Sequence, residues 1–365
     1  MRRELWKHFD FWLFGSVVVL CIFGVIMIRS AVAGNETLLP SVDKQILYVV
    51  VGVGLMIGLT MIDYHYFAPL SRLMYLFTLG LLVLVWVSGV AHLGAARWLE
   101  AGGLVLQPAE LAKITMILVL ADFFARHQNE PHDLRWLARS LLLTGSVVIW
   151  ILLQPNLSNT IVIMVIWFSL LWLSGLPVRY IVTFAALVVI LFVAAFPFLQ
   201  GYQQDRILGF LLPDSSASYG NSYNVDQALV TIGSGGLLGQ GYGHSTQVQL
   251  RFLKVRHTDF IFSAMASEFG FIGTVLVMLL LLFVIYRCFR AARLATDPYG
   301  TNIAYGFGIL LFFQTAVNIG VNLNVIPVTG LTLPFISQGG SSLISLVIGI
   351  GMIESIVSRR RTISS

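Results

Sequence analysis

The sequence predicts an all-α integral membrane protein, in which ten transmembrane helices cross the bilayer and a long extracytoplasmic loop follows the seventh. Of the 365 residues, 57% are hydrophobic and 11% are charged, whereas a soluble domain usually has about 25% charged residues. Crossing about 30 Å of hydrocarbon takes about 20 apolar residues, so the chain has material for roughly ten spans. The excess of basic residues lies at the ends of the apolar stretches. We therefore expect a single polytopic membrane domain over residues 1–365 and no nucleic-acid partner.

The expected spans follow one another along the whole chain. The first could instead be the apolar part of a secretory signal, because Ala31-Val32-Ala33 resembles a cleavage site. Its apolar run from Phe11 to Ile28 is longer than such a segment usually is, which favours an uncleaved helix. The ten spans are residues 10–29, 44–62, 71–91, 108–125, 137–153, 158–175, 179–199, 258–286, 302–325 and 336–357.

An even number of spans puts both termini on one side of the membrane. Basic residues accumulate in the connections that this topology places inside, which predicts cytoplasmic termini. The basic residues on that side are Arg2, Arg3, Lys7, Arg72, Arg126, Arg135, Arg139, Arg179, Arg287, Arg290, Arg293, Arg359, Arg360 and Arg361. The two cysteines, Cys21 and Cys288, are too few for a disulfide framework or a cysteine-rich metal site.

The outer connection between spans seven and eight, about residues 200–257, is the one large segment outside the membrane. It is rich in Gly, Ser, Gln and Tyr, with leucines and phenylalanines among them. Long loops are often functional, so we expect a partly folded lid close to the membrane. Within it, Gly233–Gly243 contains six glycines, which allow a backbone to approach a ligand closely. A flexible turn is the alternative interpretation of this glycine-rich segment.

Charged side chains stand out at the start of the fourth span. Glu110 and Lys113 are three residues apart, so they share one face of a helix that Pro108 can begin. Charges inside an apolar span are costly unless they pair or face a wet cavity. The two are therefore either a structural ion pair or part of a site. In the second case, Lys113 and Arg97 would offer positive charge to an anionic substrate.

An acidic residue lies at the entrance to the eighth span. Thr258 or Asp259 could cap that helix, because both residue types bind the free amides at a helix start. Asp259 could equally be a general base, since it lies at the water interface directly after the long loop. His257 is the weaker candidate for the base. The residues alone leave the cap and the base both open.

A series of motifs spans nearly the whole chain. They are Lys44-Gln45, Arg97-Trp98, Gln107–Lys113, Gln154-Pro155, the glycine-rich segment, Ser245-Thr246-Gln247, Leu250, Phe252-Leu253, His257–Phe262, Glu268–Gly273 and Pro327–Ser342. In this order, they resemble the SEDS family of shape, elongation, division and sporulation proteins. The short termini and the Ser-Thr-Gln stretch are more similar to the elongation branch, typified by RodA, than to the division branch, typified by FtsW.

The resemblance implies a ten-helix peptidoglycan glycosyltransferase in the bacterial cytoplasmic membrane. Such an enzyme polymerises lipid II into glycan strands at the outer membrane face during cell elongation. The resemblance also implies a class B penicillin-binding protein, which is a transpeptidase, and the elongation machinery as partners. It assigns Asp259 as the catalytic residue and places substrate-binding residues around it, namely Arg97, Glu110, Lys113, Gln247, His257, Thr258 and Ser341.

In the implied reaction, a sugar hydroxyl of lipid II attacks the anomeric carbon of a lipid-linked glycan and displaces polyprenyl pyrophosphate with inversion. Asp259 would take the hydroxyl proton, while Lys113 and Arg97 stabilise the departing pyrophosphate. Pyrophosphate leaves readily as an anion, so no second acid is needed. No cofactor is certain; a divalent cation, Mg²⁺ or Mn²⁺, could assist, with Asp259 as a ligand.

Three departures from the family pattern occur in the sequence. Asn156 stands where Asp usually follows Gln-Pro, Lys254-Val255 replaces Pro-Glu, and Gln338 replaces Tyr. The first departure removes a carboxylate, which weakens the case for that position as an acid or metal ligand.

Two further functions compete with the polymerase. Charges within spans often mark transport pathways, so a lipid-precursor flippase or transporter is one alternative. The sequence gives no pair of interrupted helices in corresponding halves, which an alternating-access transporter would favour. A non-catalytic scaffold for cell-wall assembly is the other alternative.

Overall fold

The computed structural model describes residues 7–88, 90–92, 95–101, 104–130, 133–176, 221–253 and 255–360, together with residues 180, 183, 186, 197, 201, 204, 208 and 210. Nearly all of this is helix. The long helices are α2 (Phe11–Val32), α3 (Pro40–Met61), α4 (Phe67–Ser88), α5 (Pro108–Arg126), α6 (Leu134–Leu153), α7 (Leu157–Leu173), α12 (Ile261–Leu294), α13 (Pro298–Asn322) and α14 (Gly340–Ser358). A short 3-10 helix, η1 (Tyr64–Tyr66), joins α3 to α4.

Membrane-spanning segments dominate the described part of the chain. Seven segments are long and apolar enough to cross a bilayer, and α7 is a shorter apolar helix. Helix α5 matches the predicted fourth span but carries four charged residues, Glu110, Lys113, Asp122 and Arg126. The predicted seventh span, 179–199, lies almost wholly outside the described residues. The membrane bundle is therefore confirmed, while the number of ten spans stays a prediction.

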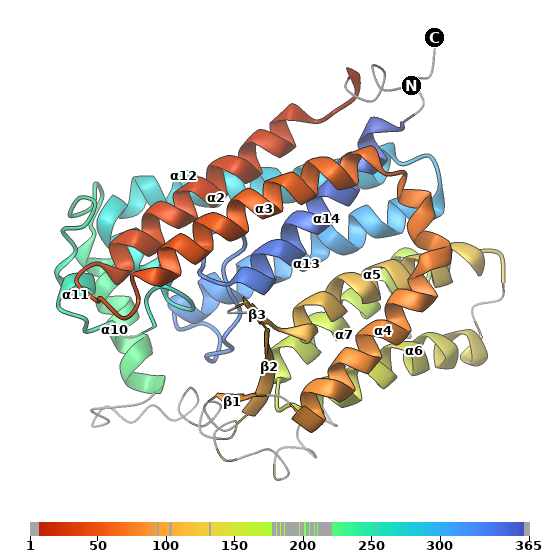
Figure 1. Cartoon of the computed structure of the whole chain (residues 1–365), viewed down its shortest axis with the longest axis horizontal. Coiled ribbons are helices and arrows are strands. Elements are labelled where there is room, and N and C mark those ends of the chain that lie inside the picture. Colours follow the sequence, from red (N-terminus) through yellow and green to blue (C-terminus); the bar gives the residue numbers. More distant parts are fainter. Residues whose placement is uncertain are drawn as a thin grey trace.

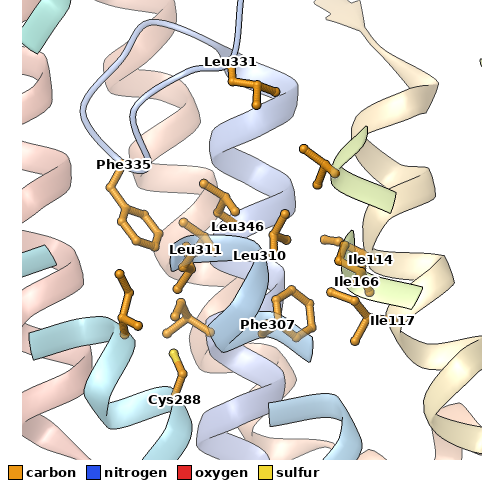
Figure 2. Packing of buried hydrophobic residues seen from close by; sticks show 14 of the residues in the cluster. Ile114, Ile117, Ile166, Cys288, Phe307, Leu310, Leu311, Leu331, Phe335 and Leu346 are labelled. Atoms are coloured by element: carbon orange, nitrogen blue, oxygen red, sulfur yellow. The ribbon is translucent and has the colours of Figure 1, made fainter. Parts of the chain in front are cut away.

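Helices α5, α13 and α14 lie inside the bundle. Figure 1 shows α4, α5, α6 and α7 grouped on one side and α2, α3 and α12 on the other. Helix α3 packs along α14, α12 along α13, and α5 against both α13 and α4. Figure 2 shows side chains from α5, α7, α12, α13 and α14 meeting in one buried cluster. Phe307 of α13 and Leu346 of α14 are members of it. This packing holds the ends of distant segments at fixed positions.

Both described ends of the chain lie at one end of the bundle. The backbone amide of Asp10, which precedes α2, donates to the Glu354 carboxylate of α14 at 3.0 Å. The Asp10 side chain accepts from Leu13 N and pairs with Arg287 of α12. Helices α10 (Asn221–Ser234) and α11 (Thr246–Gln249) lie at the opposite end (Figure 1). The two described ends, at residues 7 and 360, are thus on one side of the bundle, where an even number of spans would place them.

A three-stranded antiparallel sheet lies between α4 and α5, where we expected no strand. It consists of β1 (Val90–His92), β2 (Ala95–Ala101) and β3 (Leu104–Leu106), in the order β1-β2-β3. Ala101 pairs with Leu104, and the sequence between them is Gly102-Gly103, a dipeptide typical of tight hairpins. The predicted third span, 71–91, correspondingly ends at Ser88. The sheet places Arg97 and Trp98 on β2.

Helix α12 is interrupted, which the sequence analysis did not predict. Gly270 has φ 67° and ψ −170° inside it. The glycine-rich segment fills the break: Gln240 N and Gly241 N donate to the carbonyls of Ser267 and Glu268 at 2.9 and 3.0 Å. Phe271 N and Ile272 N donate in turn to the carbonyls of Gly236 and Leu237. Backbone groups freed by the break are thereby satisfied, as an apolar environment demands.

The described part of the expected loop, residues 221–253 and 255–257, is partly folded, as expected. Helix α10 packs against α12 and α13. Leu237 and Leu238 are 70% and 80% exposed and lie beside the exposed Phe271 of α12 through the hydrogen bonds of the break. An apolar surface of this kind is stable next to lipid.

Candidate active site

Asp259 lies in a turn directly before α12 and does not cap that helix. The N-cap residue is Phe260, which makes no side-chain capping bond. The Thr258 hydroxyl donates to the Val255 carbonyl at 3.3 Å. The N-cap position of α12 is therefore occupied by Phe260, and not by Thr258 or Asp259 as the capping interpretation expected. A half-buried carboxylate that is not needed to start the helix can serve chemistry.

The backbone of this turn is held from two directions. The side-chain amides of Asn318 and Asn322, on α13, donate to the Asp259 carbonyl at 3.1 and 3.0 Å. From residues 323–339, which connect α13 to α14, Ser337 Oγ donates to the Thr258 carbonyl at 2.8 Å. Gln338 N donates to the His257 carbonyl at 2.9 Å. The turn is consequently fixed at three successive carbonyls.

The Asp259 carboxylate lies next to Gly330 of the 323–339 connection. A Cβ atom on Gly330 would be 3.8 Å from Asp259 Oδ2. Gly330 has φ 79°, a conformation that glycine adopts at little cost. A contact between Ser158 Oγ and the Thr329 carbonyl ties this point to the start of α7. The Asp259 carboxylate therefore lies beside a connection that contacts both the start of α7 and the turn before α12.

Arg97 lies at the same end of the bundle as Asp259. Its Nε donates to the Gln154 carbonyl at 3.0 Å and its Nη2 to the Pro155 carbonyl, both between α6 and α7. Ser158, which contacts Thr329, follows only three residues later. The Arg97 side chain is half-buried, and its planar guanidinium can donate further hydrogen bonds to a phosphate. The structure thus brings a cation and an acid from distant parts of the sequence to one region.

Asn156, where the family usually has Asp, caps α7. Its side chain accepts from Asn159 N at 3.4 Å. Asn caps a helix about as well as Asp does, so the departure keeps the structural task of the position. Of the second departure, Lys254 lies outside the described residues and Val255 has φ 49°. Gln338, the third, contributes its backbone amide to the turn of Asp259.

Glu110 and Lys113 form the ion pair that their spacing predicts. Lys113 Nζ lies 2.9 and 2.8 Å from the two carboxylate oxygens of Glu110. Both side chains are buried, Lys113 at 1% exposure and Glu110 at 8%. Desolvated opposite charges hold each other strongly only when the pair is complete. The pair lies in the first turns of α5, directly after β3.

Ser341 connects this pair to α14. Its Oγ accepts from Gln107 N at 3.0 Å and donates to the Val105 carbonyl at 3.0 Å. These two bonds fix the chain between β3 and α5 and occupy the hydroxyl. Ser341 therefore positions the start of α5, where Glu110 lies.

Among the described residues, no hydrogen-bond partner is found for two buried polar atoms, His257 Nδ1 and Gln247 Oε1. Burial, and then the neighbouring Arg256 guanidinium, lower the pKa of His257 below its ordinary value. The ring is therefore neutral near pH 7, which suits a hydrogen-bonding role. Arg256 itself is buried and donates to the Ala31 carbonyl at 2.6 Å. Gln247 belongs to α11 and is half-buried.

The glycine-rich segment packs closely against α12. Cβ atoms on Gly235 and Gly239 would lie 2.1 and 2.2 Å from the carbonyl oxygens of Ala266 and Glu268. Two of the six glycines thus approach α12 closely, so at Gly235 and Gly239 the segment is a packed contact rather than a flexible turn.

The described residues hold no group of three or more His, Cys, Asp or Glu side chains that could bind a metal ion. Asp259 offers one carboxylate, and the turn's carbonyls already accept hydrogen bonds. This donor set does not make a protein-built metal site.

Asn318 and Asn322 were missed by the sequence analysis, although two amides one turn apart in an apolar helix are a visible signal.

The whole chain is similar to known cell-wall proteins. Residues 11–362 match the family model FTSW_RODA_SPOVE, described as cell cycle protein. Peptidoglycan glycosyltransferase MrdB of Escherichia coli strain K12 is 34% identical, over 100% of this chain and 98% of that protein. The probable peptidoglycan glycosyltransferase FtsW of Hydrogenovibrio crunogenus is 36% identical, over 94% and 90%.

Solved structures agree with this similarity. A chain of a peptidoglycan synthase complex that coordinates polymerization and crosslinking superposes with a TM-score of 0.82 at 32% identity, covering 96% of this chain and 97% of that one. The rod shape determining protein RodA of Thermus thermophilus superposes with a TM-score of 0.73 at 31% identity, covering 97% and 98%.

Proposed function

The chain belongs to the cell cycle protein family FTSW_RODA_SPOVE, and we propose that it is a peptidoglycan glycosyltransferase that polymerises lipid II, with Asp259 as its general base. Similarity over the full length to MrdB supports the activity. The observation that supports Asp259 most is its turn, which does not cap α12 but is fixed by α13 and the 323–339 connection.

In the proposed step, the acceptor hydroxyl oxygen of one lipid II unit bonds to the anomeric carbon of the lipid-linked glycan. The bond from that carbon to the pyrophosphate oxygen breaks, and its electron pair leaves with the pyrophosphate. Asp259 takes the hydroxyl proton. Arg97, which is half-buried at the same end of the bundle, supplies positive charge to the leaving group.

Lys113 would act differently from Arg97. Its ammonium is buried and already bound by Glu110, so a phosphate can reach it only by competing with that carboxylate. We assign Lys113 and Glu110 a structural task, in which the buried pair fixes the start of α5. Gln247, His257, Thr258 and Ser341 remain proposed substrate neighbours, and Ser341 acts through the position of Gln107.

A class B penicillin-binding protein is the proposed partner, because the chain resembles one from a synthase complex that joins polymerization to crosslinking. The elongation role rests on the similarity to MrdB and RodA; relatives named FtsW make division the alternative.

The protein is a multi-pass membrane protein, and we place both termini in the cytoplasm because both are basic.

Transport is the second candidate, because α12 is interrupted at Gly270 and carries the buried Glu268 beside the break. Interrupted helices with charged residues line many transport pathways. Purified protein mixed with lipid II separates the two functions. Glycan polymer in detergent supports the polymerase, whereas movement of lipid II across vesicles without polymer supports the flippase. If neither glycan polymer nor lipid II movement is detected even with the partner protein present, a scaffold is favoured.

A further inference from the structure

Two buried asparagines on α13 surround the Asp259 backbone. Asn318 and Asn322 lie one helical turn apart and are 1% and 0% exposed. Each donates its side-chain amide to the Asp259 carbonyl, which has a lone pair for each donor. An amide is costly to bury without such partners. Their shared target is thus a specific feature of this turn.

Asn322 determines where α12 begins. A helix that included Asp259 would bond the Ser263 amide to the Asp259 carbonyl, because backbone bonds join residues four apart. Asn322 takes both groups instead: its Oδ1 accepts from Ser263 N at 3.2 Å and from Ser263 Oγ at 2.6 Å. Its Nδ2 donates to the Asp259 carbonyl at 3.0 Å. The carboxamide therefore replaces one turn of backbone bonding and leaves Asp259 outside the helix.

Asn318 sets the position of the 323–339 connection relative to Asp259. The Nδ2 that contacts the Asp259 carbonyl also donates to the Leu331 carbonyl at 2.8 Å. Leu331 follows Gly330, the residue beside the Asp259 carboxylate. One amide thereby fixes the turn that carries the acid relative to the connection that the acid faces.

We propose that Asn318 and Asn322 are positioning residues for Asp259, which keep its carboxylate out of α12 and at a set distance from the 323–339 connection. The inference rests on the proposed role of Asp259 as the base. Neither asparagine touches substrate; both act through the Asp259 backbone. A displacement of a catalytic group by about 1 Å can cost about 10²-fold in rate.

The test compares leucine variants on a single helix. Asn318→Leu and Asn322→Leu remove the amides, and Asn302→Leu is the matched control. Asn302 is also buried on α13, and its Nδ2 donates to the Ala121 carbonyl at 3.3 Å, away from Asp259. Each purified full-length protein is assayed for glycan synthesis from lipid II, with kcat, KM and apparent melting temperature measured separately.

We expect all three variants to lose melting temperature, because each loses a buried amide bond. Only Asn318→Leu and Asn322→Leu should lose kcat, by about 10- to 100-fold, with KM for lipid II unchanged. Equal kcat in these variants and in Asn302→Leu overturns the inference. A leucine variant that does not fold is replaced by serine, which is too short to reach Asp259 and is judged by the same comparison.

An Asp259→Asn protein keeps this inference separate from the proposed function. If Asp259→Asn is inactive while both asparagine variants are normal, the base stands and the positioning role fails. If Asp259→Asn is fully active, the proposed base itself is wrong.

Discussion

A Cβ atom on Gly270 would lie 2.3 Å from the backbone nitrogen of Gly239, so the two glycines are the contact at which the glycine-rich segment enters the break in α12. The hydrogen bonds on both sides of Gly270 go to that segment. Two motifs about 30 residues apart in the sequence are therefore one structural unit, and it lies on the helix that begins beside Asp259.

Gly270→Ala should destabilise the protein. The φ and ψ of Gly270 lie in a region that is essentially restricted to glycine, at a cost on the order of 1–3 kcal/mol, and the backbone contact with Gly239 adds to it. The control is Gly233→Ala, in α10, where a Cβ meets no atom within 4 Å. Apparent melting temperatures in detergent should fall for the first variant only; equal values would contradict the account of the break.

The Glu110–Lys113 pair can be tested for structure and function separately. Lys113→Met should destabilise the protein by about 3–5 kcal/mol, because it leaves a buried carboxylate without its partner. The double variant Glu110→Gln with Lys113→Met should recover much of that stability. If the pair only fixes the start of α5, polymerisation recovers together with the stability. Recovered stability without activity would instead show that Lys113 contacts the substrate.

The helices could be predicted because lipid imposes long apolar stretches, and the described ends differ from the expected ones by only a few residues in most spans. The sheet was missed because β1 to β3 are short, although Gly102-Gly103 was a visible signal. The break at Gly270 could not be predicted from its own neighbourhood, since its hydrogen bonds come from the distant glycine-rich segment. Asp259 was proposed from its position and from the resemblance, whereas its support on α13 follows only from tertiary packing.

Stability should depend on His257 at mildly acidic pH. Burial lowers the pKa of His257 in the folded protein, so its contribution to stability is complete above the unfolded value of about 6.5. That contribution is lost as the pH falls from there through the folded value. Between pH 7.5 and 5, the melting temperature of the wild type should fall more steeply than that of His257→Gln. Parallel curves would contradict the assigned shift.

The topology predicts opposite accessibility for two exposed positions. Leu250, after α11, should lie outside the cell, and Glu130, between α5 and α6, inside. The native Cys21 and Cys288 are buried and should stay silent. A membrane-impermeant thiol reagent on intact cells should label Leu250→Cys and not Glu130→Cys. Labelling of both would contradict the proposed orientation.

Asp259→Asn is the most direct test of the central claim. The substitution keeps the shape of the side chain and the backbone bonds to Asn318 and Asn322, but an amide cannot accept a proton as a carboxylate does. We expect a protein that folds like the wild type and makes glycan from lipid II at least about 10²–10⁴-fold more slowly. Near-normal polymerisation by a well-folded Asp259→Asn protein would contradict the assignment of Asp259 as the general base.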